Sequence, residues 1–527
     1  MRIQKMKHIK RNTVLITALV LIPIILIASY FSFYFYMVGE LTSYIYEVEP
    51  STDEFYPLED MNETELRSIA NQFEYLQEEY HIPINLSQVV TFNATTGKPL
   101  LYHSDDNGAL HTSEALTATC LRYASLLAGT EKDDALRLIK KMLTGLQMLI
   151  EVPNGGLGPK FPGTAIARFY APPEKRNDGN YTWLFDEYFR HFNGTGRYSQ
   201  WRCRLYTSKD ELAGYFMAIA ACLKLVDNPY IQNITKLIIG QFTEGMLKSY
   251  WMEMSGDGKP NGVHFQWPTQ GQWKLLVMKM ATIAYPENDR YKQLYNYYLV
   301  TERYITKYPS IGDSDLIDNY YSNYFELCVI FGLMLVEDNQ DIIDIYVNNY
   351  EESTHPAFKG HRNAFLNAVY LAMCKMRSVN IEPDYDLDKV AWDVKDQLWR
   401  FVEFDLCPYD TTFGGLNKTI SREEKGTDWL EVDPNIAKWK NFVDVNPLGK
   451  MYQWVTYGLM DGVFKTRYLK PATIEMFRPN KIVWNQNPFT EEGGRQYNNS
   501  QTITQYHGAS FSLPYWILVY YGYIGGI

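Results

Sequence analysis

Apolar residues recur three and four positions apart along most of the chain beyond residue 110, which is the pattern of amphipathic helices. The pattern predicts helices in pairs, with a short break inside each pair. The pairs are 111–129 with 132–152, 209–227 with 229–251, 270–284 with 288–307, 320–336 with 339–350, and 362–377 with 385–400. Two weaker, more aromatic helices are expected at 450–466 and 507–523. The fold class that follows is all-α.

Long segments rich in Gly, Pro, Trp and Asp separate the pairs. They cover 153–208, 253–269, 308–319, 351–361 and 401–449. Tight turns within pairs and long crossovers between them are typical of helical hairpins packed side by side. Six such hairpins can close into an (α/α)6 toroid, and an open helical array is the alternative. In the toroid the long segments and the positive N-terminal ends of the inner helices share one face, which favours a ligand cleft there.

The N-terminal region has a different pattern. No charged residue occurs between Asn12 and Gly39, and a helix of that length spans roughly 40 Å, enough to cross a membrane. Basic residues precede this run and acidic residues follow it, which predicts a cytoplasmic N-terminus. A cleaved signal peptide is the alternative. We therefore divide the chain into a basic cytoplasmic tail, a signal anchor in contact with membrane lipid, a stem and an extracytoplasmic toroid, at residues 1–11, 12–39, 40–105 and 106–527.

The stem contains a predicted helix at 63–80 and an extended stretch at 88–103. N-glycosylation sequons support an extracytoplasmic location for everything beyond the anchor. They lie at Asn62, Asn85, Asn93, Asn180, Asn193, Asn417 and Asn498, and at Asn233, which falls in a predicted helix and is the least suited to modification.

Composition narrows the classes of partner and site that fit the chain. The 527 residues carry a net charge of −11, and beyond the basic tail at residues 1–11 we find no basic patch, so nucleic acid is not an expected partner. Aromatic residues make up 15% of the chain, which suits sugar rings, although additional core and surface aromatics are the simpler explanation. The six cysteines do not form a disulfide framework and lack zinc-ligand spacing. Cys120, Cys222, Cys328 and Cys374 are expected to be core thiols, and Cys203 and Cys407 are the two that could form a bridge.

The sharpest local motif is Thr207-Ser208-Lys209-Asp210-Glu211-x-x-Gly214. One interpretation is structural: Thr207 or Ser208 caps a helix whose first turn carries acids favoured by the helix dipole. The functional interpretation is that Asp210 or Glu211 points into the cleft as an acid, a base or a sugar-hydroxyl acceptor.

The other long segments add polar groups to the same face. The candidate catalytic carboxylates are Asp210, Glu211, Asp257, Asp313 and Asp315, and the candidate substrate-binding residues are His264, Gln266, Trp267, His361 and His507. Asp257 begins a stretch that superficially resembles a calcium loop, but Lys259 occupies a ligand position and no Glu closes the loop. No metal site or cofactor is expected, and serine esterase, metalloprotease and nucleotide-binding motifs are absent from the sequence.

Four segments give the chain a resemblance to six-hairpin glycosidase-like proteins. They are TSKDELAGYFMAIAACLKLVDNP, MSGDGKPNGVHFQW, HRNAFLNAVYLAMCK and HGASFSLPYWILVYYGYI, and the resemblance covers roughly residues 110–525. It implies an (α/α)6 toroid of carbohydrate-related ancestry. Lys209 and Glu211 stand where that family's motif has arginine and glutamine, so only Asp210 and Gly214 carry over at the level of the motif.

The sequence therefore predicts a membrane-anchored protein that acts on, or binds, a surface or extracellular glycan. Glycoside hydrolysis by a carboxyl pair is the first expectation. A polysaccharide lyase, with His264 or His507 and a tyrosine as base and acid, is one alternative. A non-catalytic glycan-binding or scaffold subunit that keeps the toroid is the other.

Overall fold

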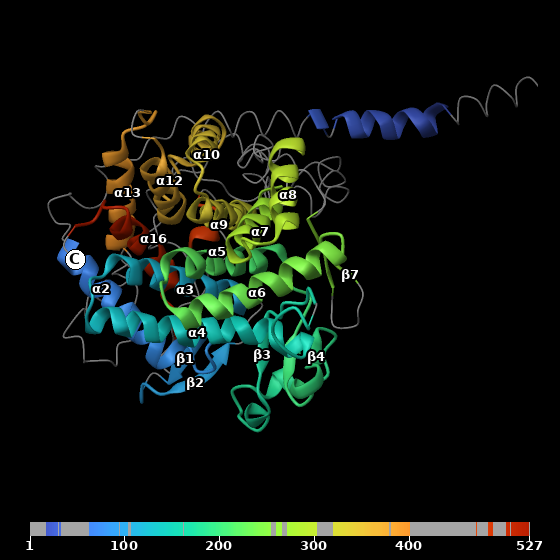
Figure 1. Cartoon of the computed structure of the whole chain (residues 1–527), viewed down its shortest axis with the longest axis vertical. Coiled ribbons are helices and arrows are strands. Elements are labelled where there is room, and N and C mark those ends of the chain that lie inside the picture. The colour runs from blue at the N-terminus through green and yellow to red at the C-terminus, as the bar shows by residue number, and fades with distance from the viewer. Residues whose placement is uncertain are drawn as a thin grey trace, which may run out of the picture.

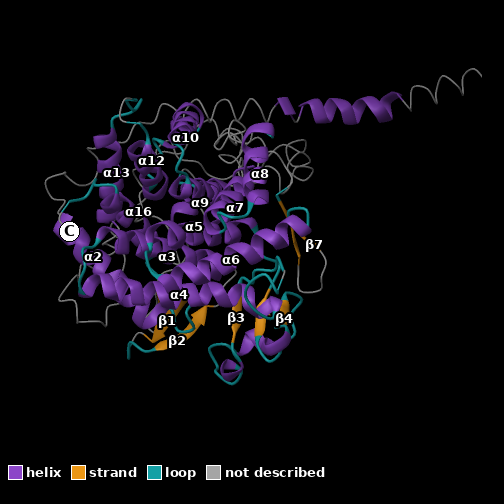
Figure 2. Ribbon diagram, in the orientation of Figure 1, coloured by secondary structure: helices purple, strands orange, loops and turns teal. Residues whose placement is uncertain are grey.

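The computed structural model shows a mostly helical protein with small sheets (Figure 2). It describes residues 17–29, 31–32, 63–93, 95–103, 107–161, 163–254, 260–265, 271–302, 320–378, 381–400, 471, 483–488, 502–505 and 507–525. The helices beyond the N-terminal region are α2 (Glu63–Leu76), α3 (Gly108–Ser125), α4 (Thr130–Asn154), α5 (Lys209–Leu225), α6 (Pro229–Lys248), α7 (Gly271–Ala284), α8 (Asp289–Asn296), α9 (Tyr320–Val336), α10 (Gln340–Ser353), α11 (His355–Phe358), α12 (Ala364–Met376), α13 (Leu387–Arg400) and α16 (Ala509–Tyr520).

Five helices form the centre of the molecule. Helix α3 packs against α5, α5 against α9, α9 against α12, α12 against α16, and α16 back against α3. Helix α7 packs against both α5 and α9. Every residue from Gly108 to Arg122 in α3 and from Asp210 to Cys222 in α5 is buried. A helix buried on all sides needs apolar or small residues all round, which explains why these two sequences lack a polar face.

A second set of helices covers this centre (Figure 1). Helix α4 packs on α3, α6 on α5, α8 on α7, α13 on α12 and α2 on α16. These outer helices have charged residues on one side. Pro229 stands first in α6, where the N-cap residue Asn228 accepts hydrogen bonds from the N–H groups of Tyr230 and Ile231. Such caps fix where an outer helix begins.

Three small antiparallel sheets accompany the helices; in Figure 2, β1 to β4 lie along the lower edge of the helical body and β7 lies at its right-hand side. Strand β1 (Val89–Asn93) lies between β2 (Pro99–His103) and β8 (Thr502–Gln505), with Val90 paired to Tyr102 on one side and to Gln505 on the other. Strand β5 (Arg202–Arg204) lies between β3 (Phe169–Ala171) and β4 (His191–Asn193). Strands β6 (Met252–Met254) and β7 (Pro260–His264) form a hairpin.

The predicted helix pairs between residues 111 and 400 are confirmed, with bounds that differ by a few residues, and the extended stretch 88–103 is confirmed as β1 and β2. The predicted helix at 288–307 is split into α8 and a π-helical turn at Tyr297–Thr301. The helix expected at 450–466 lies outside the described residues. The sheets of β3–β5 and β6–β7, inside the long segments, are not anticipated by helical periodicity.

The range assigned to a stem shows a different arrangement from the one expected. Its described part contributes Leu66, Ile69 and Phe73 to the same hydrophobic core as α3 and α16. The reason is that α2 has its own apolar face, which covers α16, and that β1 pairs with β8 from the far end of the chain. Residues 63–103 are therefore part of the packed unit.

The predicted anchor is only partly described: residues 17–29 and 31–32 are helical, and their side chains are mostly exposed, as at Leu19 (66%). Among the described residues, no helix has both the length and the apolar character required to cross a membrane. The anchor therefore stays a prediction.

The sequons and cysteines lie in varied surroundings. Asn193 and Asn233 are exposed, Asn85, Asn93 and Asn180 are half-buried, and Asn62, Asn417 and Asn498 lie outside the described residues. Cys120, Cys222 and Cys328 are buried free thiols and Cys374 is a half-buried one, as expected of core cysteines. Cys203 is also a free, buried thiol and contacts the carbonyl oxygen of Phe192 at 3.7 Å, whereas Cys407 lies outside the described residues.

A glycine contact tests whether residues 63–103 pack as described. A Cβ atom at Gly145 of α4 would lie 1.9 Å from the carbonyl oxygen of Asn85, whose own φ is 65°. We predict that Gly145→Ala lowers the free energy of unfolding by about 1–3 kcal/mol, because backbone must move to admit the methyl group. Gly179→Ala is the control, since nothing lies within 4 Å of a Cβ there. Urea unfolding measures both, and a neutral Gly145→Ala would show that the two segments are apart.

Candidate functional site

Glu211, one of the predicted carboxylates, links the N-terminal ends of α5 and α3. Its Oε2 accepts a hydrogen bond from the main-chain N–H of Leu110, 3.1 Å away. Leu110 is the third residue of α3, so this N–H has no partner inside its own helix. The Glu211 side chain is fully buried. An acid of one helix thus caps the start of another.

Asp210, the preceding residue, links α5 to α9. The phenol of Tyr321, in the first turn of α9, donates a hydrogen bond to Asp210 Oδ2. Burial first, and then the carboxylates of Asp210, Glu211 and Glu114, raise the pKa of Tyr321 well above its ordinary value. All three carboxylates therefore lie close enough to interact with this one phenol.

Glu114 completes the group from the second turn of α3. It accepts a hydrogen bond from the phenol of Tyr324 on α9. We call Glu114, Asp210, Glu211, Tyr321 and Tyr324 the carboxylate–tyrosine cluster. Glu114 is 1% exposed and Glu211 0%, whereas Asp210 is 7% exposed. Asp210 is thus the carboxylate in the cluster that an approaching molecule can touch most directly.

The N-terminal ends of α12 and α16 are joined to the same end of α9. The phenol of Tyr320 lies 3.1 Å from Nδ1 of His361 and 3.3 Å from the amide nitrogen of Asn363, which caps α12. Asn363 also donates to the carbonyl oxygen of Trp484, whose indole N–H donates to the carbonyl oxygen of Ser510 in α16. Burial lowers the pKa of His361 to about 3, so this ring is neutral at physiological pH.

Two further contacts involve His507, which precedes α16, and Trp273 of α7. The His507 ring lies 4.6 Å from that of His111, at the start of α3, and burial lowers the pKa of His507 well below its ordinary value. On the other side, the indole N–H of Trp273 on α7 lies 3.3 Å from Glu326 Oε2 on α9. The N-terminal ends of α3, α5, α9, α12 and α16 are thereby linked by side-chain contacts.

The local capping interpretation of the motif at residues 207–214 is wrong. Ser208 is the N-cap residue of α5, but its side chain makes no capping hydrogen bond, and the Thr207 hydroxyl donates instead to the carbonyl oxygen of Ile166. Glu211 instead accepts a hydrogen bond from the start of α3. Gly214 has the predicted role of allowing close approach, since a Cβ there would lie 3.1 Å from Cα of Leu110.

Several predicted site residues are not placed by the structure. Asp257, Gln266, Trp267, Asp313 and Asp315 lie outside the described residues. His264 ends β7, and the surroundings of its side chain are not described. The site therefore consists of Asp210 and Glu211 from the predicted carboxylates, with His361 and His507 at neighbouring helix ends.

Sequence reasoning missed Glu114, Tyr321, Tyr324 and Asn323. Asn323 is fully buried on α9, and its amide nitrogen and oxygen have no hydrogen-bond partner in the described part of the chain. Glu114 carried a usable signal: it is the one acid in HTSEALTATC, a stretch without a polar face. The two tyrosines carried no such signal, because a chain with 42 tyrosines offers many equivalent candidates.

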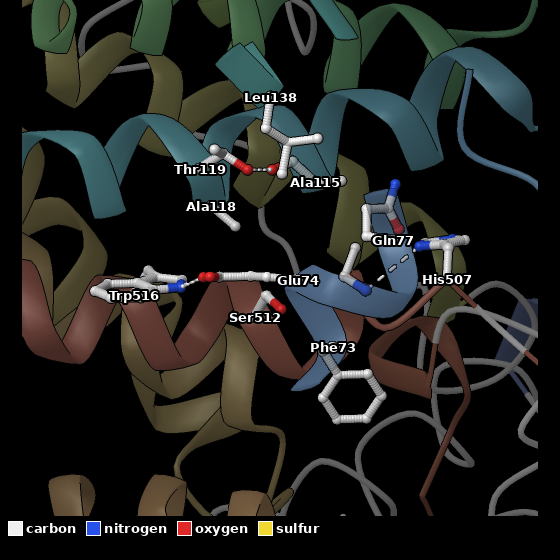
Figure 3. Close-up of a pocket in the computed structure, with 11 residues that line it drawn as sticks. Phe73, Glu74, Gln77, Ala115, Ala118, Thr119, Leu138, His507, Ser512 and Trp516 are labelled. Atoms are coloured by element: carbon white, nitrogen blue, oxygen red, sulfur yellow. Dashed lines mark hydrogen bonds between the residues drawn. The ribbon is translucent and has the colours of Figure 1, made fainter. Parts of the chain in front are cut away.

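A pocket lies between α2, α3 and α16, and the predicted substrate-binding residue His507 is among the residues that line it (Figure 3). Glu74 and Trp516 point toward one another across it, with the Trp516 indole N–H donating to Glu74 Oε1 at 2.8 Å. Arg122 pairs with the other oxygen, Oε2, at 3.0 Å. Burial nevertheless raises the pKa of Glu74, since the ion pair only partly offsets desolvation. Because both oxygens are occupied and the remaining lining is mostly apolar, this pocket is a packing gap at the back of α16.

The chemistry available at the carboxylate–tyrosine cluster is proton transfer and hydroxyl recognition. Carboxylates accept hydrogen bonds from hydroxyl groups, and a carboxyl group beside a phenol can exchange a proton with a bound molecule. In the described ranges, no group of three or more His, Cys, Asp or Glu side chains is arranged to hold a metal ion. Comparison of the chain with family models, curated proteins and solved structures found no match.

A buried histidine in α11, the short helix before α12, allows the effect of burial on a side-chain pKa to be tested. His355 begins α11, is fully buried, and stacks on Tyr370 with 3.7 Å between ring centroids. Neither ring nitrogen has a hydrogen-bond partner among the described residues. Burial, with Lys359 nearby, lowers the pKa of His355 to about 3.

The sign of the pH effect follows from that shift. An unfolded histidine titrates near about 6.5, so unfolding takes up a proton between pH ~6.5 and ~3 and stability falls as the pH is lowered through that window. We predict that His355→Phe leaves the free energy of unfolding at pH 7 within about 1 kcal/mol or raises it, because no hydrogen bond is lost. It should also reduce the loss of stability between pH 7 and pH 5 by about 2 kcal/mol. Urea unfolding at both pH values measures this, and an unchanged pH dependence would contradict the assignment.

Proposed function

We propose that the helices form an (α/α)6 toroid. The closed series of contacts from α3 through α5, α9, α12 and α16 back to α3 supports this proposal, with α7, which packs against both α5 and α9, as the sixth inner helix. The outer helix on each of α3, α5, α7, α12 and α16 supports it as well. The toroid has a functional consequence, because it brings helix N-termini from distant parts of the sequence to one end of the molecule. Glu114, Asp210 and Glu211 all lie near that end.

We propose further that this end acts on a surface or extracellular glycan by glycoside hydrolysis. The single observation that carries the proposal is that Asp210, next to the buried Glu211 at the start of α5, accepts a hydrogen bond from the phenol of Tyr321, while Glu114 of α3 accepts one from Tyr324 of the same helix α9. Glycoside hydrolysis requires one protonated and one ionised carboxyl group. The two neighbouring carboxyl groups of α5 have unlike hydrogen-bond partners, because Glu211 accepts a main-chain N–H whereas Asp210 accepts a phenol. Asp210, the most exposed of the three, is the group assigned to contact the sugar.

One observation favours a second candidate, a non-catalytic glycan-binding or scaffold subunit. Glu211 is fully buried and its carboxylate satisfies the start of α3. A carboxylate used in this way stabilises the fold and needs no substrate. The two candidates differ at Asp210, because the scaffold does not require this residue to be an acid.

Asp210→Asn separates them. The amide oxygen of asparagine can still accept the Tyr321 hydrogen bond, so the fold should be kept. We predict that Asp210→Asn lowers the rate of sugar release from a sensitive polysaccharide by about 100-fold or more, which is typical for loss of a general acid or base, while binding is retained. The measurement is release of reducing ends from a panel of polysaccharides.

Asp289→Asn is the matched control, because Asp289 lies on the surface of α8 with an 84% exposed side chain. It should leave turnover within about twofold of the wild type, as expected for an exposed carboxylate whose ion pair contributes little. Turnover that survives Asp210→Asn, or a wild type that releases sugar from no polysaccharide, would favour the scaffold.

We also propose that residues 12–39 anchor the protein in a cell membrane, with the helical domain extracytoplasmic and glycosylated. The uncharged run and the exposed apolar side chains of residues 19–27 support this. The full-length protein should then stay with membranes through alkaline carbonate washing, and a variant lacking residues 1–39 should not. Release of the full-length protein by carbonate would contradict the anchor. Removal of a glycan from the exposed Asn193 by a glycosidase would indicate that the domain lies on the extracytoplasmic side of the membrane.

A further inference from the structure

The long segment before α5 contains a group of aromatic and basic side chains, two of them exposed and three half-buried, that the carboxylate–tyrosine cluster does not use. We define Tyr188, Phe189, Arg190, Phe192 and Tyr206 as the aromatic–arginine surface. Phe189 is 63% exposed and Tyr188 48%. Their ring centroids lie 4.7 Å apart, and Tyr206 lies 6.2 Å from Phe189 and 6.1 Å from Phe192. Large aromatic side chains this open to solvent are unusual in a protein that buries most of its rings.

Charge distinguishes this region from the rest of the chain. Residues 160–206 contain eight Lys and Arg against four Asp and Glu, a net of +4, whereas the whole chain carries −11. This excess of positive charge does not stand out in the sequence, because the cations are spread over 45 residues rather than forming a run. The small sheet of β3, β5 and β4 brings several of them together.

Strand register places two of these cations beside the aromatic rings. His191 pairs with Arg204 and Asn193 pairs with Arg202 across β4 and β5, so these four side chains share one face of the sheet. The His191 ring lies 5.0 Å from that of Tyr188. The Arg190 guanidinium lies over the Phe189 ring at 5.0 Å. The Arg190 guanidinium is therefore the cation in direct contact with an exposed ring, whereas Arg202 already donates to the carbonyl oxygens of Leu184 and Asp186 and to Asn193 Oδ1.

The surface is continuous in sequence with the carboxylate–tyrosine cluster. Tyr206 comes four residues before Asp210, and α5 begins at Lys209. Tyr206 has a φ of 62°, which non-glycine residues rarely adopt, and Arg168 Nε donates to its carbonyl oxygen at 2.8 Å. Such strain is kept where the surrounding structure fixes a residue for a purpose.

We propose that the aromatic–arginine surface binds an anionic glycan, a sugar chain bearing carboxylate or sulfate groups, and directs it toward Asp210. This inference rests on the proposed function, because it names the class of substrate for that site. Aromatic faces pack against the apolar C–H faces of pyranose rings, and guanidinium groups bind carboxylates and sulfates with paired hydrogen bonds. The spacing of exposed rings next to cations matches a chain in which sugar rings and charges alternate.

The test uses the full-length protein with Asp210→Asn, so that bound chains are not cleaved. The probes are two matched pairs: oligogalacturonate with its methyl ester, and dextran sulfate with dextran. Binding is measured by fluorescence anisotropy at two salt concentrations. We expect at least one anionic member to bind tenfold or more tightly than its neutral partner, with affinity falling as salt rises.

Surface variants locate the binding. Tyr188→Ala and Phe189→Ala should each weaken binding of the anionic chain by about tenfold, given the usual contribution of one stacked aromatic ring. Tyr230→Ala is the matched control, because Tyr230 is 47% exposed at the start of α6, away from this surface in sequence, and should have no effect. Arg190→Gln should remove most of the preference for the charged member of each pair. Equal unfolding midpoints establish that all variants are folded.

Three outcomes would overturn the proposal: equal binding of the charged and neutral members, tighter binding of an oligodeoxythymidylate than of either anionic glycan, or equal losses in Tyr188→Ala and Tyr230→Ala. Failure here is distinguishable from failure of the proposed function. If the wild type cleaves a neutral glycan and ignores charged ones, the substrate class is wrong and hydrolysis stands. If anionic chains bind but Asp210→Asn does not change turnover, the surface stands and the catalytic role fails.

Discussion

The structure depends on how the buried main-chain N–H groups and carboxylates at the starts of its central helices are satisfied by hydrogen bonds. A buried helix start leaves N–H groups without partners, and burying a carboxylate is costly unless it receives hydrogen bonds. Glu211 and Leu110 resolve both problems at once, although 101 positions separate them in the sequence. The Tyr321–Asp210 and Tyr324–Glu114 hydrogen bonds satisfy two more buried carboxylates, across 111 and 210 positions. These contacts between distant helices hold the central helix ends together.

The same hydrogen bonds determine the surroundings of the two acids at the start of α5. The positive end of α5 favours acids at its second and third positions, so Asp210 and Glu211 are stabilised where they lie. Because one of these acids caps α3 and the other meets a phenol of α9, they occupy unlike surroundings although they are neighbours in the chain. A carboxylate group assembled this way contributes to stability, and Asp210 is its most exposed member. The aromatic–arginine surface adjoins it because the chain runs directly from Tyr206 into α5.

Much of the fold could be predicted from the sequence because helical periodicity is strong in the paired segments, and the start of α5 at Lys209 followed from its motif. The partners of Glu211 and Asp210 could not be predicted. A Ser followed by acids is the local signature of a capped helix, and only the tertiary structure shows that Glu211 caps a different helix. The β3–β5 sheet was missed because its strands are three residues long, too short for an alternating pattern to emerge. Residues 63–103 were assigned to a stem because nothing local in the sequence indicates that β1 pairs with β8, which comes from the opposite end of the chain.

A double-mutant cycle at Tyr324 and Glu114 tests the central claim most directly, since this pair joins α3 to α9 in the interior. The free energies of unfolding of Tyr324→Phe, Glu114→Gln and the double variant are compared with the wild type by urea unfolding. Our account predicts a coupling energy of about 1.5 kcal/mol or more, as for a buried hydrogen bond to a charged group. Effects that add to within about 0.5 kcal/mol would show that the two side chains do not meet, and the convergence of helix ends would then be wrong.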